Sequence, residues 1–436
     1  MTDQDERTIH VPVLARVEGE GALDLNIKNG EISKLQLRIF EPPRLFEKFL
    51  EGYSYKEVPD IVARICGICP VAYQMSAIHA LESIFKVESD IPTKNWIRNM
   101  RRVLYCGEWI QSHSLHIHLL AAPDFLGFDN AIAMAKQYPE QVNRGLGLQA
   151  IGNKLIALFG GRSVHPVGSC VGGFYHAPSL QEVSELVNEM EALLPDAEQL
   201  IHWTASLDLP QHEQDFTCVA MRHENEYPLN EGRLVSSKGL DISIDQYQDY
   251  FSEFQVPHST SLHSTLNEQP YLVGPLARIN LNLDCLPENI KQIIDSLDIN
   301  FPSSNMFHSI VARAIEITFA LQEAIRLLNE YILPEQTSLS VTPRAGTCYG
   351  CTEAPRGILW HRYDCGEDGK ITHAIIIPPT SQNQAQMELD LRKSLTDFGL
   401  QQSDDKLRQH GEMIIRNYDP CISCSTHFLR IKVDRS

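Results

Sequence analysis

The chain has 436 residues, of which 43% are hydrophobic and 21% charged, an ordinary composition for a globular protein with a sizeable core. Its formal net charge of -19 argues against a nucleic-acid partner and against binding to an anionic membrane surface, because both require a basic face. Eleven scattered cysteines, a polar N-terminus without a signal-peptide pattern and the lack of a long apolar run predict a cytoplasmic protein without direct membrane insertion.

The chain starts with a predicted β hairpin. Apolar and polar residues alternate in 22–27 and again in 32–37. The two runs flank Asn29 and Gly30, a dipeptide that favours a tight turn between antiparallel strands. Helical periodicity follows and continues up to a first pair of cysteines.

That pair, Cys66 and Cys69, is expected at the end of a helix, because Pro70 follows it and proline is common just beyond helix ends. A second pair with the same spacing, Cys421 and Cys424, stands near the C-terminus. Two intervening residues allow both sulfurs to bind one metal, but the pairs of a small zinc module lie about 12–20 residues apart. If these distant pairs meet, they do so inside a large folded core.

Between the pairs the pattern is mainly helical. The polar stretch 206–270 is interpreted as a peripheral insertion with short strands, and Ala374 to Ile377 as a buried strand. The predicted fold class is mainly α with a smaller β-containing part (α+β), in one large subunit. Its expected parts are an N-terminal hairpin region at about 9–40, a helical core at about 44–205 and 284–331, the insertion, a C-terminal α/β region at about 338–427 and a tail at 428–436.

Five motifs in the same order resemble the large, catalytic subunit of [NiFe]-hydrogenases, and the resemblance covers nearly the whole chain. The sequence around Cys69 to Tyr73 is most similar to the cytoplasmic NAD(P)-linked hydrogenases, also called sulfhydrogenases. The resemblance implies that family's bundle of long helices and the reversible heterolytic oxidation of H2. The motifs are Arg16-Val17-Glu18-Gly19, Arg64 to Pro70, Gly160 to Pro166, Glu353-Ala354-Pro355-Arg356-Gly357 and Asp419 to His427.

The resemblance also implies a Ni-Fe(CN)2(CO) centre. All four cysteines would bind nickel, with Cys66 and Cys421 as terminal ligands and Cys69 and Cys424 bridging to the iron. Thiolates are soft ligands that suit nickel and iron better than magnesium or calcium. The alternative is a structural zinc site, or reduced cysteines that simply pack in the core.

Other residues match positions around that centre. Glu18 would be the first proton acceptor from the Cys421 thiolate, and Arg356 would lie over the open nickel–iron position. Thr380 would donate a hydrogen bond to a cyanide, and Asp124 would orient Arg356. Buried negative charge requires cations and donors of this kind.

Glu47 and His427 resemble the carboxylate and imidazole that hold a second metal, Mg2+, near the C-terminus. In the family a maturation endopeptidase cuts after this histidine once nickel-insertion factors have delivered the metal. The sequence therefore predicts removal of Phe428 to Ser436.

Two positions depart from the family, since Tyr73 and Glu20 stand where many members carry histidine. These departures argue against a proton or electron route like that of the periplasmic enzymes, and they leave the four cysteines untouched. A third cysteine pair precedes Arg356 and is interpreted as packing, with redox activity or adventitious metal binding as alternatives. Packing or structural roles are expected for Cys348, Cys351, His113, His116 and His118.

The chain has no dinucleotide-binding fingerprint and no ferredoxin-like cysteine run. Iron–sulfur clusters, flavin and NAD(P) are therefore expected on partners, namely a small iron–sulfur subunit and diaphorase-type subunits. The alternatives are a hydrogenase coupled to ferredoxin or a heterodisulfide, and an H2 sensor. The related quinone-site subunit of respiratory complex I is disfavoured because it has lost the cysteine ligands.

Overall fold

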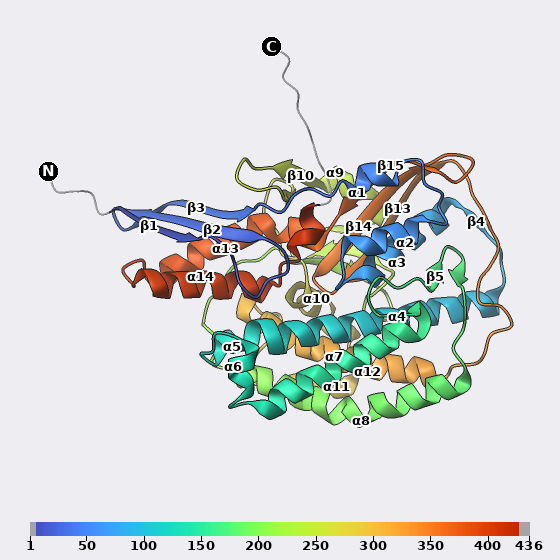
Figure 1. Ribbon diagram of the computed structural model, residues 1–436, viewed down its shortest axis with the longest axis horizontal. Coiled ribbons are helices and arrows are strands. Elements are labelled where there is room, and N and C mark those ends of the chain that lie inside the picture. Colours follow the sequence, from blue (N-terminus) through green and yellow to red (C-terminus); the bar gives the residue numbers. More distant parts are fainter. Residues whose placement is uncertain (1–5, 427–436) are drawn as a thin grey trace, which may run out of the picture.

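The computed structural model describes residues 6–426, in which long helices lie beside small antiparallel sheets (Figure 1). The predicted α+β class is therefore confirmed. Within the described residues, no helix combines the length and the apolar character needed to cross a membrane.

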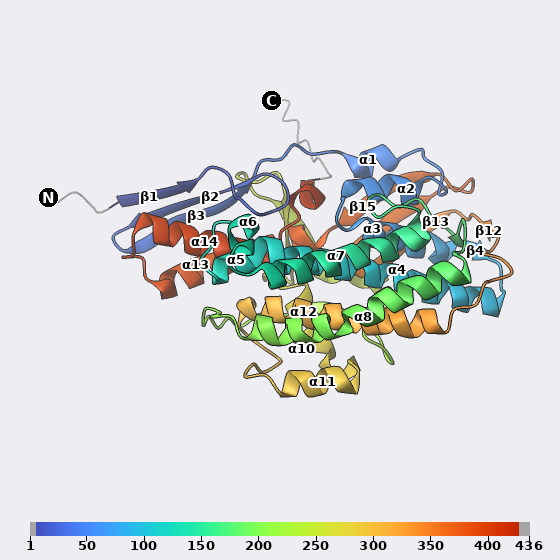
Figure 2. The ribbon, with the colours of Figure 1, turned by 60° about the horizontal axis from the view of Figure 1, so that its bottom comes forward.

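Four long helices form the helical core: α4 (Ile91–Leu115), α7 (Pro139–Gly160), α8 (Leu180–Ala205) and α12 (Ser309–Asn329). Helix α12 is buried along most of its length because it packs against both α4 and α8. Figure 2 shows α8 and α12 as a layer below α4 and α7.

Local sequence explains where these helices begin. Asp90 accepts a hydrogen bond from the Thr93 amide at the start of α4. Ser179 and Glu182 form a reciprocal capping box at the start of α8. Both contacts satisfy amide groups that a helix leaves without partners in its first turn.

The N-terminal sheet has the strand order β1 (Glu6–Val11), β2 (Gly21–Lys28) and β3 (Glu31–Ile39), all antiparallel. The predicted hairpin turn is confirmed, since Asn29 and Gly30 have φ of 55° and 78°, as a type I′ turn requires. This sheet packs against α13 (Pro379–Phe398) and α14 (Asp404–Tyr418) (Figure 1).

A second antiparallel sheet contains β13 (Gly346–Ala354), β14 (Gly357–Cys365) and β15 (Ile371–Ile377) in that order. Helix α3 (Pro70–Ile84) lies across β13 and β14. The expected strand at 374–377 is part of β15, so that prediction is confirmed.

Pro70 was predicted to follow the end of a helix, but it lies in the first turn of α3. The prediction was wrong because proline is favoured at both places: its fixed φ suits the first helical turn, and there its missing N–H costs no bond. The cysteine pair therefore lies between two helical segments, after the 3-10 turn Ala63–Ile65 and before α3.

Short strands occur within 206–270, as expected, although the division of the chain into parts stays a prediction. The remaining helices and strands are α1 (Phe46–Leu50), α2 (Val58–Val62), β4 (Lys86–Val87), the π-helical turn His116–Ala121, α5 (Ala122–Phe125), α6 (Ala131–Ala135), β5 (Ser169–Cys170), β6 (Gly173–Phe174), β7 (Val219–Arg222), β8 (Arg233–Ser236), β9 (Asp241–Ile242), the 3-10 turn Ile244–Gln246, α9 (Tyr247–Tyr250), β10 (Phe251–Gln255), β11 (Leu262–Leu266), α10 (Pro275–Asn282), the 3-10 turn Leu283–Cys285, α11 (Glu288–Asp295), the 3-10 turn Met306–His308, β12 (Val341–Thr342) and the 3-10 helix Ile422–Thr426.

Candidate metal centre

The two cysteine pairs from opposite ends of the chain meet in the core. The Sγ atoms of Cys66 and Cys421 are 3.4 Å apart, and those of Cys69 and Cys424 are 3.7 Å apart. All four sulfurs lie within 4.8 Å of one another, and no side chain of the four is more than 4% exposed. Four converging, buried sulfurs can surround a metal centre.

The first pair is held by α3 and α4. The amides of Ile68 and Cys69 both donate to the Cys66 sulfur at 3.3 Å. Glu108 of α4 accepts hydrogen bonds from the Val71 and Ala72 amides, at 2.6 Å and 3.1 Å, in the first turn of α3. Glu108 thereby fixes the start of the helix directly after Cys69, a role that the sequence analysis missed.

Burial raises the pKa of the Glu108 carboxyl well above its ordinary value.

The second pair lies in the 3-10 helix near the C-terminus and is held by Glu18. The backbone oxygen of Glu18 accepts from the Ile422 amide at 3.0 Å. Its carboxylate Oε2 accepts from the Ser423 amide at 3.0 Å and from the Cys421 thiol at 3.2 Å. Glu18 is therefore close enough to exchange a proton with Cys421.

Glu18 lies between strands β1 and β2 and forms an isolated bridge with Cys421. Burial raises the pKa of its carboxyl, and negative charge on Cys66 raises it further. The neighbouring Gly19 has φ of 89°, and a Cβ there would lie 2.6 Å from Cβ of Ile422. Glycine thus permits the close approach of the two segments.

Arg356 lies at the same centre and pairs with Asp419. Its Nε donates to the Asp419 backbone oxygen at 2.8 Å, and its Nη2 donates to the carboxylate at 3.0 Å. Its Nη1 is buried without a hydrogen-bond partner in the described part of the chain. Burial disfavours the cation, but Asp419 and then the nearby cysteines raise the pKa of Arg356 well above its ordinary value.

The prediction that Asp124 orients Arg356 was wrong. The Asp124 carboxylate instead pairs with Arg16 and, at 2.7 Å and 2.9 Å, with Arg416. Asp419 makes the contact that was expected of Asp124. Residue type alone did not distinguish the two aspartates, although Asp419 belongs to the motif that carries Cys421.

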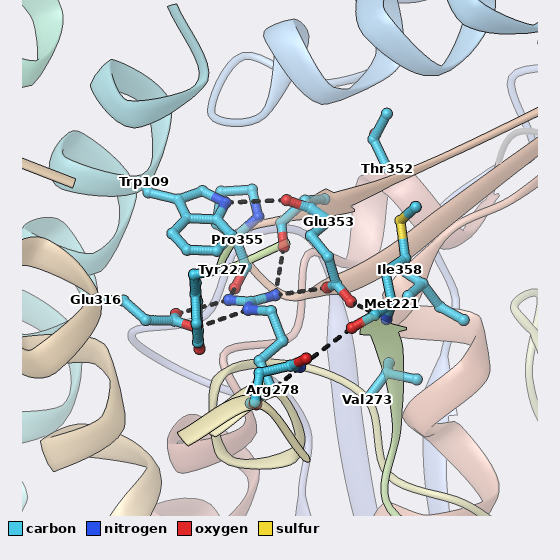
Figure 3. Close-up of polar contacts among 12 residues, drawn as sticks. Trp109, Met221, Tyr227, Val273, Arg278, Glu316, Thr352, Glu353, Pro355 and Ile358 are labelled. Atoms are coloured by element: carbon cyan, nitrogen blue, oxygen red, sulfur yellow. Dashed lines mark hydrogen bonds and ion pairs between the residues drawn. The ribbon is translucent and has the colours of Figure 1, made fainter. Parts of the chain in front are cut away.

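A buried charge network supports the loop that carries Arg356 (Figure 3). The Arg278 guanidinium donates to the backbone oxygens of Ala354 at 2.8 Å and Pro355 at 2.9 Å. It also pairs with Glu316 at 2.7 Å and with Glu353 at 3.0 Å, one on each side (Figure 3). Arg278 was not predictable from the family motifs, because none of the five contains it.

The two carboxylates of this network have pKa values shifted in opposite directions. Burial alone would raise the pKa of Glu316, but the charge and hydrogen bonds of Arg278 lower it to about 2. Burial raises the pKa of Glu353 to about 7, because Arg278 compensates it less. Glu316 is therefore the ionised partner of Arg278 at neutral pH.

Thr380 lies in the first turn of α13 and Glu47 lies in α1, and the roles of both residues stay predictions. The Thr380 hydroxyl accepts a hydrogen bond from the Cys421 amide at 3.0 Å. Glu47 accepts from the Ile376 amide at 2.7 Å. His427 and the predicted tail 428–436 lie outside the described residues.

The third cysteine pair does not form one metal site. Cys348 and Cys351 lie on strand β13 in two different core clusters, and the Cys348 thiol donates to the Tyr363 backbone oxygen at 3.4 Å.

Tyr73 is buried in α3, and burial together with the charge of Cys424 raises its pKa well above its ordinary value.

The three histidines are buried in the helical core. His113 pairs with Glu316 at 2.9 Å, and His116 contacts the Arg416 backbone oxygen at 2.8 Å. His118 contacts the backbone oxygen of Ser114 at 3.0 Å. These contacts agree with structural roles.

The residues fit an anionic nickel–iron centre. Four buried thiols supply soft ligands, and Glu18 supplies a carboxylate next to one of them. The unpartnered Nη1 of Arg356 is a buried cationic donor, which an anionic group bound beside the cysteines would satisfy.

The family model for nickel-dependent hydrogenases matches residues 44–147 and 245–427 of the chain. Sulfhydrogenase 1 subunit alpha of Pyrococcus furiosus is 31% identical over 98% of this chain and all of its own length. The NAD-reducing hydrogenase HoxS subunit beta of Cupriavidus necator is 29% identical over 97% of this chain and 95% of its own.

Solved structures agree with this result. A crystal structure of an NAD+-reducing [NiFe]-hydrogenase in the H2-reduced state is similar with a TM-score of 0.85 and 26% identity, covering 97% of this chain and 99% of the other. The Ni-Fe-Se hydrogenase from D. vulgaris Hildenborough, at 23% identity and a TM-score of 0.79, shares the fold over 97% of this chain and all of its own. The chain belongs to the nickel-dependent hydrogenase family and is a [NiFe]-hydrogenase catalytic subunit.

Proposed function

We propose that this hydrogenase subunit works in the cytoplasm and exchanges electrons with NAD(P) through iron–sulfur and diaphorase-type partner subunits. The observation that carries its chemistry is the convergence of four buried sulfurs with the Glu18 carboxylate beside one of them. The reaction converts H2 into two protons and two electrons. Those electrons and one proton reduce NAD(P)+ to NAD(P)H on a partner.

Each cysteine has a proposed place in the centre. By the family resemblance, all four cysteines would hold the nickel, and Cys69 and Cys424 would hold the iron as well. When bound, the Ni-Fe(CN)2(CO) centre supplies the heterolytic cleavage of H2. The chain itself contributes ligands, charge balance, exclusion of water and a path for the proton.

The proton path starts at Cys421. Its thiol donates to Glu18 Oε2 at 3.2 Å, so the carboxylate accepts the proton directly, without an intervening water. The raised pKa of Glu18 makes it a better acceptor near neutral pH than an exposed glutamate.

Arg356 is proposed to lie over the open nickel–iron position, and Thr380 is proposed to donate a hydrogen bond to a cyanide of the iron. Arg356 has one buried nitrogen without a partner among the described residues, and its two other donors are fixed by Asp419. The Thr380 hydroxyl already accepts from the Cys421 amide, which leaves its own proton available for donation.

A second metal, Mg2+, is proposed to bind Glu47 and His427, and a maturation endopeptidase is proposed to remove Phe428 to Ser436 after nickel insertion. Glu47 is attached to strand β15 through the Ile376 amide. Intact mass of the nickel-loaded enzyme tests the cleavage: a chain that still ends at Ser436 contradicts it.

The name of the Cupriavidus necator relative supports NAD(P) as the acceptor, and that of the solved NAD+-reducing enzyme supports it independently. The test is to isolate the native complex, identify its co-purifying chains and measure nickel, iron and zinc. Infrared bands of cyanide and carbon monoxide, H2-dependent dye reduction and H2-dependent reduction of NAD+ or NADP+ are expected. Zinc without nickel sinks the hydrogenase assignment, whereas reduction of ferredoxin but not of NAD(P)+ sinks only the acceptor.

A further inference from the structure

Two histidines and a glutamate form a second cluster of metal-binding side chains, away from the cysteines. His258 lies in the loop between β10 and β11, His263 lies on β11, and Glu388 lies in the middle of α13. One ligand atom from each side chain lies within 4.8 Å of the other two. Elements that are distant in sequence thus bring together two imidazoles and one carboxylate.

The distances suit a small tetrahedral cation. His258 Nε2 is 2.9 Å from Glu388 Oε1, and His263 Nε2 is 3.5 Å from Glu388 Oε2. Zinc binds nitrogen and oxygen at about 2.0–2.2 Å, so neighbouring ligand atoms in a tetrahedron are roughly 3.3 Å apart. The two observed separations lie on either side of this value; they run to different oxygens of Glu388, of which a zinc ion with a water ligand takes one.

His263 is incompletely satisfied for a buried imidazole. The residue is 2% exposed, its Nδ1 has no hydrogen-bond partner among the described residues, and its Nε2 lies 3.5 Å from Glu388 Oε2 without a hydrogen bond. A neutral imidazole has one donor and one acceptor, and buried groups of this kind are normally satisfied. A cation next to Glu388 would bind the acceptor nitrogen.

Glu388 is oriented for such a role. Its Oε1 accepts a hydrogen bond from the Leu37 amide of β3 at 2.9 Å, a contact of the kind that fixes metal-binding carboxylates. Its two oxygens face the two histidines.

We propose that His258, His263 and Glu388 form a binding site for one zinc ion, with water as the fourth ligand. Two imidazoles and one carboxylate suit zinc, whereas calcium and magnesium prefer oxygen ligands throughout. His258 lines a surface hollow of about 440 Å³, through which the ion and its water enter.

The site connects three parts of the fold. It fastens the β10–β11 hairpin to the middle of α13, while the Leu37 amide attaches β3 to the same carboxylate. The first turn of α13 carries Thr380, which contacts the Cys421 amide. Bound zinc therefore stabilises the helix that reaches the cysteine centre.

A second acidic cluster provides a comparison. His223, Glu226 and Glu231 also lie close together, but both carboxylates already pair with Arg98, at 2.6 Å and 2.9 Å. A cation there would have to displace an arginine. His223→Ala is therefore a matched control that removes one histidine without affecting the proposed site.

The experiment adds Zn2+ alone to the chelator-treated, nickel-containing holoenzyme and measures bound zinc by equilibrium dialysis with elemental analysis. The wild type and His223→Ala are expected to bind one zinc per chain in addition to the nickel–iron centre. His258→Ala and Glu388→Gln are expected to bind it at least ~100-fold more weakly. Co2+ in place of zinc is expected to give the visible bands of tetrahedral cobalt without thiolate charge-transfer bands.

Glu388→Gln keeps an acceptor for the Leu37 amide, so the fold is expected to survive this change, and the melting temperature without zinc checks it. The inference is overturned if the wild type takes up no additional zinc, or if His258→Ala and Glu388→Gln bind as tightly as the wild type. Thiolate bands in the cobalt spectrum also overturn it, because they assign the ion to cysteines. None of these results bears on the nickel–iron centre.

Discussion

Glu18→Gln separates the two tasks of Glu18, which are to hold the C-terminal segment and to accept a proton. The backbone oxygen that receives the Ile422 amide is unchanged by the substitution. The glutamine amide oxygen can still accept from the Ser423 amide, which now binds Oε2 at 3.0 Å. The segment with Cys421 is therefore expected to stay in place and the nickel content to remain unchanged.

The proton transfer is expected to fail. A neutral amide cannot take the proton that the Cys421 thiol now donates at 3.2 Å. A positioned general base contributes about 10²- to 10⁴-fold, so H2 turnover and H/D exchange should fall by that factor. This corresponds to a barrier higher by about 3–5 kcal/mol.

The assay measures nickel and iron content, H2-dependent dye reduction and H/D exchange on the same preparation. Glu20→Gln is the matched control, because Glu20 is exposed and lies two positions further along the same segment. Near wild-type H/D exchange in a fully metal-loaded Glu18→Gln enzyme would refute the proton role. Loss of nickel from Glu18→Gln would instead show that the carboxylate itself is needed to hold the C-terminal segment in place.

Three further changes test the support of the site. Arg278→Met leaves two buried carboxylates without their cation and is expected to lower the free energy of unfolding by about 3–5 kcal/mol in a denaturant titration. The control Arg222→Met removes a partly exposed ion pair and is expected to cost less than ~1 kcal/mol in the same titration. Gly19→Ala and Gly30→Ala both place alanine at positive φ, but only Gly19→Ala meets a close neighbour, so it alone is expected to reduce nickel content in elemental analysis. Burial lowers the pKa of His118 from 6.5 to about 4. As the pH falls, the unfolded chain therefore protonates this histidine before the folded chain does, and the free energy of unfolding decreases by about 3 kcal/mol between pH 6.5 and pH 4. In His118→Phe, the free energy of unfolding measured across that range should depend less on pH.

Local chemistry explains which parts of the fold were predictable. The Asn29-Gly30 turn was predictable because both residues tolerate positive φ, and few other dipeptides do. The role of Pro70 was not predictable from its neighbours, since proline suits both the residue after a helix and the first turn of the next one. Tertiary packing of α3 on the β13–β14 hairpin decided between them.

The candidate site shows the same division. The cysteine spacing and the flanking motifs indicated which residues would meet, and the structure brings the four sulfurs together. The family resemblance assigned Asp124 as the partner of Arg356, and the sequence itself places no constraint on contacts between distant segments that could have corrected this. Asp419 makes the contact from a left-handed conformation, with φ of 55°, that ends α14 and turns the chain toward Cys421.

The two cysteine pairs are held in place by different parts of the chain. Cys66 and Cys69 are fixed by amides of their own loop and by the contact of Glu108 with α3, all within the region 66–108. Cys421 and Cys424 are fixed by groups from elsewhere, through the contacts of Glu18 with residues 421–423 and of Thr380 with the Cys421 amide. The first pair can therefore form while the C-terminal segment is undocked, and the four-sulfur site is completed only when that segment reaches Glu18. Metal delivery before docking would meet an open half-site, and docking would then bury it.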